Sequence, residues 1–231
     1  MDENFKKNRK LWFRVVKVII RIFKGRCKYV YLGEEYQGPC LVLSNHSGAS
    51  GPLAHELYTN KRIRLWGTYE MNSGIKQVYK YLSTIYFHQK KHINKTLSKI
   101  IGFIAAPFLY IFYRGLKLIA TYPDYRFKNT LKESMEAILD NQSLIIFPEN
   151  SSNGYFDEIK EFKTGWYAFA SYAYTKGYDL PIFIAYYQKK TKTLIFDKKV
   201  MFSELLALGL NKEDLSDRLR KRCNELGKMK I

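Results

Sequence analysis

The side chains best suited to chemistry follow the first of two apolar runs. Residues 41–43 lead into Ser44, Asn45 and His46, and a turn rich in glycine and serine comes next. Imidazole titrates near neutral pH, so a histidine at the end of a buried strand can take a proton from a hydroxyl. His46 is therefore a candidate general base. The alternative is a histidine that only hydrogen-bonds its own turn.

A carboxylate follows the second apolar run. Residues 143–147 end at Pro148 and Glu149, and a polar loop continues from there. Glu149 is suited to holding a hydroxylated substrate, and it is equally suited to accepting hydrogen bonds from the N–H groups of its own loop. In sheets of the α/β type, sites form where strands end and loops begin. Both segments are therefore candidates for one functional site.

Strand-like and helix-like patterns alternate along the chain. Strands are expected at 28–32, 39–43, 62–68, 143–147, 181–187 and 193–197, and helices at 50–58, 74–87, 126–139, 162–174 and 211–226, the last one capped by Asn211. This order predicts an α/β fold, in which a single domain holds a largely parallel central sheet flanked by helices. We place that domain at residues 28–231.

The first residues predict an amphipathic helix over 5–24. Its basic residues are spaced three or four apart and form one stripe, with aliphatic and aromatic side chains around the rest: Lys7, Lys10, Arg14, Lys17, Arg21 and Lys24. Such a helix suits the plane of an anionic membrane interface. We therefore expect residues 1–27 to attach the protein to the cytoplasmic face of a membrane, as a peripheral or monotopic protein. Packing on the protein's own core is the alternative.

Residues 100–113 carry no charge over fourteen positions. A helix that spans a bilayer needs about 20 apolar residues, so this run is short, and Pro107 would kink it. Two interpretations stay open: a helix of the core, and a segment that dips into a membrane.

The chain has 39 Lys and Arg against 21 Asp and Glu, a formal net charge of +18. This excess indicates an anionic partner, which is a membrane, an acidic substrate or a nucleic acid. Because aliphatic side chains rather than stacking aromatics back the basic stripe, we expect no nucleic-acid partner.

The remaining candidate ligands indicate neither a disulfide framework nor a cofactor. Cys27, Cys40 and Cys223 lie far apart, as free thiols of a reducing cytosol do. His88 and His92 share the spacing of a helical metal pair but stand among lysines, so we expect no metal. No glycine-rich nucleotide fingerprint occurs, and no cofactor is predicted.

Taken together, the segments resemble the phospholipid/glycerol acyltransferase family, which includes the 1-acylglycerol-3-phosphate acyltransferases. Four motifs match in the family's order, over roughly residues 35–190, and the ordered set is more specific than any one motif. The first motif is read from Asn45-His46 to Gly51-Pro52, the second from Gly115 to Thr121, the third from Phe147-Pro148-Glu149 to Asn153 with Phe162-Lys163-Thr164-Gly165 behind it, and the fourth from Leu180 to Ala185.

This resemblance implies an enzyme of phospholipid biosynthesis. A fatty acyl group would move from acyl-CoA or acyl carrier protein to a hydroxyl of a lysophospholipid or related lipid, with His46 as the base. Substrate-binding roles fall, on the same resemblance, to residues of the first and third motifs and to nearby cations: Asn45, Ser47, Glu149, Asn150, Ser151, Ser152, Lys163, Gly165 and Arg126.

Three positions depart from the family pattern. Gly51 stands where the family has the aspartate that orients the histidine, and Glu56 is the nearest carboxylate in sequence to replace it as a catalytic partner. On this interpretation Gly51→Asp restores a partner for His46.

Thr121 and Ser152 stand where the family has arginines that hold phosphate. Their loss favours an acceptor other than a glycerol phosphate, with Arg126 and Lys163 as possible compensating cations. The alternative function is a catalytically impaired relative that binds lipid or regulates.

Overall fold

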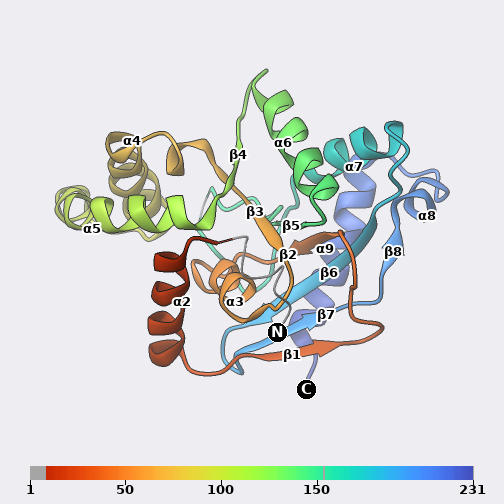
Figure 1. Cartoon of the computed structure of the whole chain (residues 1–231), viewed down its shortest axis with the longest axis horizontal. Helices are drawn as coiled ribbons and strands as arrows, with labels where there is room; N and C mark the ends of the chain where they lie inside the picture. Colours follow the sequence, from red (N-terminus) through yellow and green to blue (C-terminus); the bar gives the residue numbers. More distant parts are fainter. Residues whose placement is uncertain (1–8, 153, 231) are drawn as a thin grey trace.

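One β-sheet runs through the part of the chain that this computed structural model describes, residues 9–152 and 154–230 (Figure 1). Its strands are β1 (Lys28–Tyr31), β2 (Leu41–Ser44), β3 (Ile63–Thr68), β4 (Ile119–Thr121), β5 (Ser143–Ile146), β6 (Pro181–Gln188), β7 (Thr193–Phe196) and β8 (Val200–Met201). Helices flank this sheet, most of its strand pairs are parallel, and the predicted α/β fold class is confirmed.

The order of strands across the sheet is β1-β7-β6-β2-β5-β3-β4, and β8 pairs with β6. β2 lies in the middle and pairs in parallel with β5 on one side and β6 on the other. Leu43 is level with Ile146, so the residues that follow β2 and β5 leave the sheet side by side. The antiparallel pairs are those of β6 with β7 and with β8.

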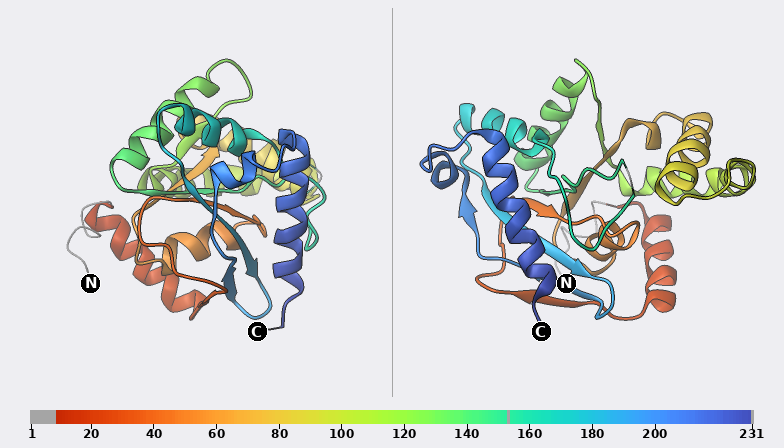
Figure 2. Two further views of the ribbon diagram at one scale, coloured as in Figure 1. Left: turned by 90° about the vertical axis from the view of Figure 1, so that its right-hand side faces the viewer. Right: turned by 180° about the vertical axis from the view of Figure 1, so that it is seen from behind.

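The helices cover both faces of the sheet. They are α2 (Leu11–Lys24), α3 (Ser50–Tyr58), the 3-10 turn η1 (Tyr69–Met71), α4 (Ile75–Lys80), the wide-turn helix η2 (Tyr81–Lys90), α5 (Lys95–Leu116), α6 (Phe127–Leu139), α7 (Gly165–Thr175), α8 (Phe202–Leu206) and α9 (Lys212–Lys228). Figures 1 and 2 show α6, α7 and α9 on one face, α2 and α3 on the other, and α4, η2 and α5 projecting as a side arm.

Alternation along the strands explains this two-sided core. Leu41 and Leu43 of β2 pack in the cluster that includes Trp166 of α7, whereas Val42 packs in the cluster that includes Ala54 of α3. Successive side chains of a strand point to opposite faces, so an unbroken apolar strand needs a cover on both sides. The central strands are apolar and fully buried for this reason.

Local signals placed several elements well. α3 occupies the predicted residues 50–58, and α9 begins after Asn211, whose side chain accepts a hydrogen bond from the Asp214 amide at 2.8 Å. The helix expected over 74–87 is divided into α4 and η2. β4, β8 and α8 were not predicted, because segments of two to five residues show no measurable periodicity.

The uncharged run 100–113 lies inside α5, which continues through Pro107. One side of α5 packs on α4 and η2, while the opposite side leaves Phe103 and Phe108 74% and 72% exposed. The interpretation as a core helix is therefore wrong. Among the described helices, α5 is the one long and apolar enough to cross a membrane.

The middle of the basic stripe, at Lys17 and Arg21, faces the protein, contrary to our expectation, while Lys10 and Lys24 at its ends are exposed. Lys17 and Arg9 are buried against Glu56 of α3, with N–O distances of 3.0 and 2.9 Å, and Arg21 donates to the carbonyl oxygen of Leu57. A buried carboxylate needs such counter-charges, and α2 turns its cations inward to supply them. Ile22 and Phe23 are 74% and 84% exposed as a result. Lys7 lies outside the described residues.

Candidate functional site

His46 sits in a tight turn after β2, where Ser47 and Gly48 both have left-handed backbone conformations, with φ of 43° and 65°. The carbonyl oxygen of His46 accepts a hydrogen bond from the Gly51 amide at 3.1 Å, which closes the turn into α3. In the same turn, the His46 Nδ1 atom contacts the carbonyl oxygen of Gly48. A carbonyl oxygen only accepts, so Nδ1 carries the proton and Nε2 keeps its lone pair.

Aromatic rings enclose the imidazole of His46. The Tyr155 ring stacks on it at 4.6 Å between centroids, and the Phe147 ring meets it edge-on at 5.1 Å. Burial, and secondly the positive charge of Lys90, lower the pKa of His46 to about 4. The ring is therefore neutral at physiological pH, as a proton acceptor must be.

Glu149 lies beside His46, at the end of the adjacent strand β5, but it does not contact the imidazole. Its Oε2 accepts a hydrogen bond from the His46 backbone amide at 3.1 Å. Burial raises the pKa of Glu149, while the amides of His46 and Phe156 and the charge of Lys90 oppose that rise. Glu149 thus accepts a hydrogen bond from the backbone at the strand end, whereas the hydrogen-bond partner of the His46 ring is the Gly48 carbonyl.

Glu56 is not the partner of His46. Its carboxylate is 1% exposed and accepts hydrogen bonds from Arg9 and Lys17. α3 is a regular helix here, and Glu56 lies on the side that faces α2. The catalytic role expected for Glu56 is thus corrected to a structural one, the anchoring of α2.

Position 51 has no room for the family's aspartate. A Cβ atom added to Gly51 would lie 2.6 Å from the carbonyl oxygens of both Asn45 and His46. Such a distance is well inside van der Waals contact, so any side chain here must open the turn. Gly51 allows the turn in which the Gly48 carbonyl meets Nδ1, and the expectation that Gly51→Asp restores a partner is revised accordingly.

The polar residues around the two strand ends mostly hydrogen-bond one another. Asn45 clamps β2 to β6, because its side chain accepts from the Tyr187 amide at 2.7 Å and donates to the Tyr187 carbonyl at 3.2 Å. Asn150 donates to Glu161 at 2.7 Å and accepts from Ser152 at 2.8 Å. Asn45, Asn150 and Ser152 therefore shape the loops rather than point free side chains at a substrate.

Three other predicted site residues differ in how close they come to His46. Lys163 is exposed, yet its charge lowers the pKa of Lys90, which places it near the site. Gly165 begins α7 and borders the rings of Phe127 and Trp66 instead. Arg126 pairs with Asp124 after β4, three strands from β2, and is not brought to His46.

Sequence reasoning missed Lys90 and Tyr155. Lys90 ends η2, and its ammonium donates to Ser151 Oγ at 2.7 Å and to the Tyr155 hydroxyl at 3.4 Å. No pattern in the sequence indicated this, since Lys90 follows His46 by 44 positions and lies in the side arm. Nearby, His88 uses Nδ1 to contact the Ile93 carbonyl oxygen at 2.9 Å.

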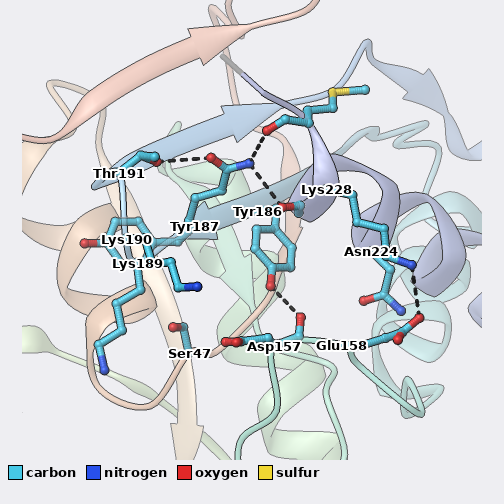
Figure 3. Close-up of a pocket in the computed structure, with 13 residues that line it drawn as sticks. Ser47, Asp157, Glu158, Tyr186, Tyr187, Lys189, Lys190, Thr191, Asn224 and Lys228 are labelled. Carbon is cyan, nitrogen blue, oxygen red and sulfur yellow. Dashed lines mark hydrogen bonds and ion pairs between the residues drawn. The ribbon is translucent and has the colours of Figure 1, made fainter.

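A pocket of about 330 Å³ opens beside the histidine turn and includes Ser47 in its wall (Figure 3). The β6–β7 hairpin contributes Lys189 and Lys190, and the end of α9 contributes Lys228. Asp157 and Glu158 also line the pocket, and Glu158 pairs with Lys228 at 3.3 Å (Figure 3). The pocket reaches the histidine turn at Ser47, and His46 itself is not among its lining residues.

Neither protein-family models nor curated proteins gave a match to this chain. The fold and the site therefore define a mixed α/β protein with a neutral, ring-enclosed histidine at a strand end.

Proposed function

We propose that this protein is an acyltransferase at the cytoplasmic surface of a membrane. It moves a fatty acyl group from acyl-CoA or acyl carrier protein to a hydroxyl of a lysophospholipid or related lipid. The state of His46 carries the proposal: Nδ1 is engaged by Gly48, the ring is neutral, and Nε2 holds the lone pair. The ordered resemblance to the glycerolipid acyltransferases supports the choice of reaction.

The reaction needs one base and no cofactor. Nε2 of His46 takes the proton of the acceptor hydroxyl while that oxygen attacks the carbonyl carbon of the thioester. The carbon–sulfur bond then breaks, and the departing thiolate takes the proton from His46. The imidazolium formed in between has the Gly48 carbonyl as its hydrogen-bond partner, a weaker stabiliser than the carboxylate of a His–Asp pair.

The exposed apolar faces of α2 and α5 support a membrane location. The two helices lie at the same end of the molecule (Figures 1 and 2), and Phe13 of α2 packs on Phe112 of α5 with ring centroids 5.3 Å apart. Their exposed side chains include Leu11, Val15, Val18, Ile22, Phe23, Ile100, Phe103, Ile104, Phe108 and Ile111. Monotopic proteins bury such faces in the acyl boundary of one leaflet.

Cations at the ends of these helices suit an anionic lipid surface. Lys10 and Lys24 flank α2, and Lys95, Lys99 and Arg114 lie toward the ends of α5; all five are exposed. The proposed partner is still an anionic membrane, as the composition indicated, but the basic stripe of α2 is no longer the surface that contacts it. The apolar face of α2 enters the lipid, and the flanking cations meet the head groups.

The first test is a transfer assay on anionic vesicles. Labelled acyl-CoA and an acyl carrier protein thioester would each be offered with lysophosphatidate, other lysophospholipids and neutral hydroxylated lipids. We expect transfer to at least one acceptor, loss of transfer in His46→Ala, and normal transfer in the exposed control His88→Ala. Full activity of His46→Ala would remove His46 from the mechanism.

A lipid-binding protein without catalysis is the second candidate function. The observation that favours it is the absence of a carboxylate against the His46 ring in the described part of the chain. In the same assay this candidate predicts vesicle binding with no transfer from either donor, in the wild type and in His46→Ala alike.

A further inference from the structure

The ammonium of Lys90 is half-buried and has no anionic partner in contact. Its hydrogen-bond acceptors are the hydroxyls of Ser151 and Tyr155, and it forms no ion pair with a carboxylate among residues 9–152 and 154–230. Its charge also lies over the Tyr155 ring, 5.1 Å from the centroid. Burial lowers the pKa of Lys90 while the charges of Glu149 and Glu70 raise it, but neither carboxylate forms an ion pair with it. A partly buried cation without a contacting counter-ion is costly, so an anion from outside would complete this arrangement.

A second cation lies next to the histidine turn. The ammonium of Lys91 is 3.7 Å from the position that a Cβ atom would take at Gly48. The Lys91 ammonium therefore lies against the turn that carries His46. Lys163 adds a third positive charge, close enough to lower the pKa of Lys90. Burial is the larger cause of that lowered pKa, and the charge of Glu149 opposes it.

We propose that Lys90 and Lys91 form a phosphate-binding site next to His46. The class of ligand is a phosphate ester, because two flexible ammonium groups, one of them beside the hydroxyls of Ser151 and Tyr155, suit a compact polyanion. The site stands in place of the family's phosphate-holding arginines, which Thr121 and Ser152 replace here. If the phosphate is that of the acceptor, the site revises the expectation that the acceptor is other than a glycerol phosphate.

The place of the phosphate follows from the rings. Tyr155 stacks on His46 and also accepts a hydrogen bond from Lys90, so one ring contacts both the base and the cation. A phosphate on Lys90 therefore lies near the imidazole of His46, as expected if the reacting hydroxyl and the phosphate belong to one small molecule. This reading rests on the acyl-transfer function proposed above. The existence of the anion site does not depend on that function.

Direct binding tests the site without catalysis. Inorganic phosphate, sn-glycerol 3-phosphate and coenzyme A would be titrated by calorimetry into the full-length protein and into Lys90→Met, which keeps the apolar stem and removes the charge. Lys80→Met on α4, an exposed lysine of the same arm, is the matched control. We expect Lys90→Met to bind inorganic phosphate about tenfold more weakly or worse, Lys91→Met to lose less, and Lys80→Met to bind as the wild type.

The two phosphate sources are separated by the organic ligands. A selective loss of glycerol 3-phosphate binding in Lys90→Met assigns the site to the acceptor head group, and a selective loss of coenzyme A binding assigns it to the donor. Unchanged affinity of Lys90→Met for all three ligands overturns the site. If Lys90→Met loses phosphate binding but the wild type transfers no acyl group, the site stands and the proposed reaction fails.

Thermal unfolding gives a second readout. Without phosphate, Lys90→Met should melt at or above the temperature of the wild type, because it removes a poorly compensated charge. Added phosphate should raise the melting temperature of the wild type and leave that of Lys90→Met unchanged. A Lys90→Met protein that melts lower than the wild type in both buffers contradicts the inference, since the lysine would then be a structural group.

Discussion

The imidazole of His46 is enclosed by Tyr155 and Phe147 and held at Nδ1 by Gly48, and this environment sets its acid–base behaviour. Only the neutral imidazole accepts a proton, and the pKa of His46 in the free protein is about 4. The kcat/KM of transfer should therefore stay level as the pH falls from 8 to about 5 and drop to half near pH 4. An acidic limb centred near the ordinary histidine value of about 6.5 would contradict this environment.

Gly51 is the residue whose replacement should be least tolerated in the turn. Gly51→Ala and Gly51→Asp both force the carbonyl oxygens of Asn45 and His46 aside, so we expect each to lower the unfolding free energy by about 1–3 kcal/mol, measured by urea denaturation. Gly38→Ala is the control, because a Cβ atom there meets nothing within 4 Å. A Gly51→Asp protein as stable as the wild type and faster in transfer would restore the aspartate to the site.

At the scale of elements, the ion-paired group of Arg9, Lys17 and Glu56 attaches α2 to α3. Glu56→Ala leaves two buried cations without their partner, and we expect a loss of about 3–5 kcal/mol in unfolding free energy. Glu158→Ala, which removes an exposed partner of Lys228, should cost less than about 1 kcal/mol. Transfer per folded molecule should be retained in Glu56→Ala. A stable variant without activity would return Glu56 to a catalytic role.

The apolar face of α5 is the second prediction at this scale. The double change Phe103→Ser and Phe108→Ser removes two exposed aromatic rings, and burying one such side chain is worth about 1.5–3 kcal/mol. We therefore expect flotation with anionic vesicles to weaken by at least about tenfold. Leu139→Ser on α6, which is 59% exposed on a different helix, is the control and should float as the wild type does. Equal flotation of all three proteins would exclude α5 from the lipid contact.

For the whole molecule, the part-buried His46 and the buried His55 link stability to pH. Burial lowers the pKa of His46 to about 4 and that of His55, whose Nε2 lies 3.0 Å from Ser44 Oγ, to about 3. The unfolded chain takes up protons first, near pH 6.5, so this stability is complete above that pH and is lost as the pH falls toward the folded values.

The corresponding measurement is the urea midpoint at pH 7, 5.5 and 4. The midpoint should fall with pH in the wild type and fall less in His55→Phe, which removes one of these two protonation sites. Parallel curves for the two proteins would show that His55 does not contribute to the acid sensitivity.

The sequence determined much of the scaffold and of the site's two anchor points. Apolar strands with caps and turns between helices predicted the parallel sheet, and strand ends at His46 and Glu149 were readable because local patterns carry that information. His46 and Glu149 lie close together because β2 pairs with β5.

Only the tertiary structure decided which groups serve His46. Glu56 was the nearest carboxylate in sequence, but the direction of its side chain depends on the packing of α2. Lys90 comes from a side arm, and its approach depends on how η2 packs. The outward face of α2 was misread for the same reason: helical spacing shows that two faces differ, but the pairing of a buried charge decides which one turns inward.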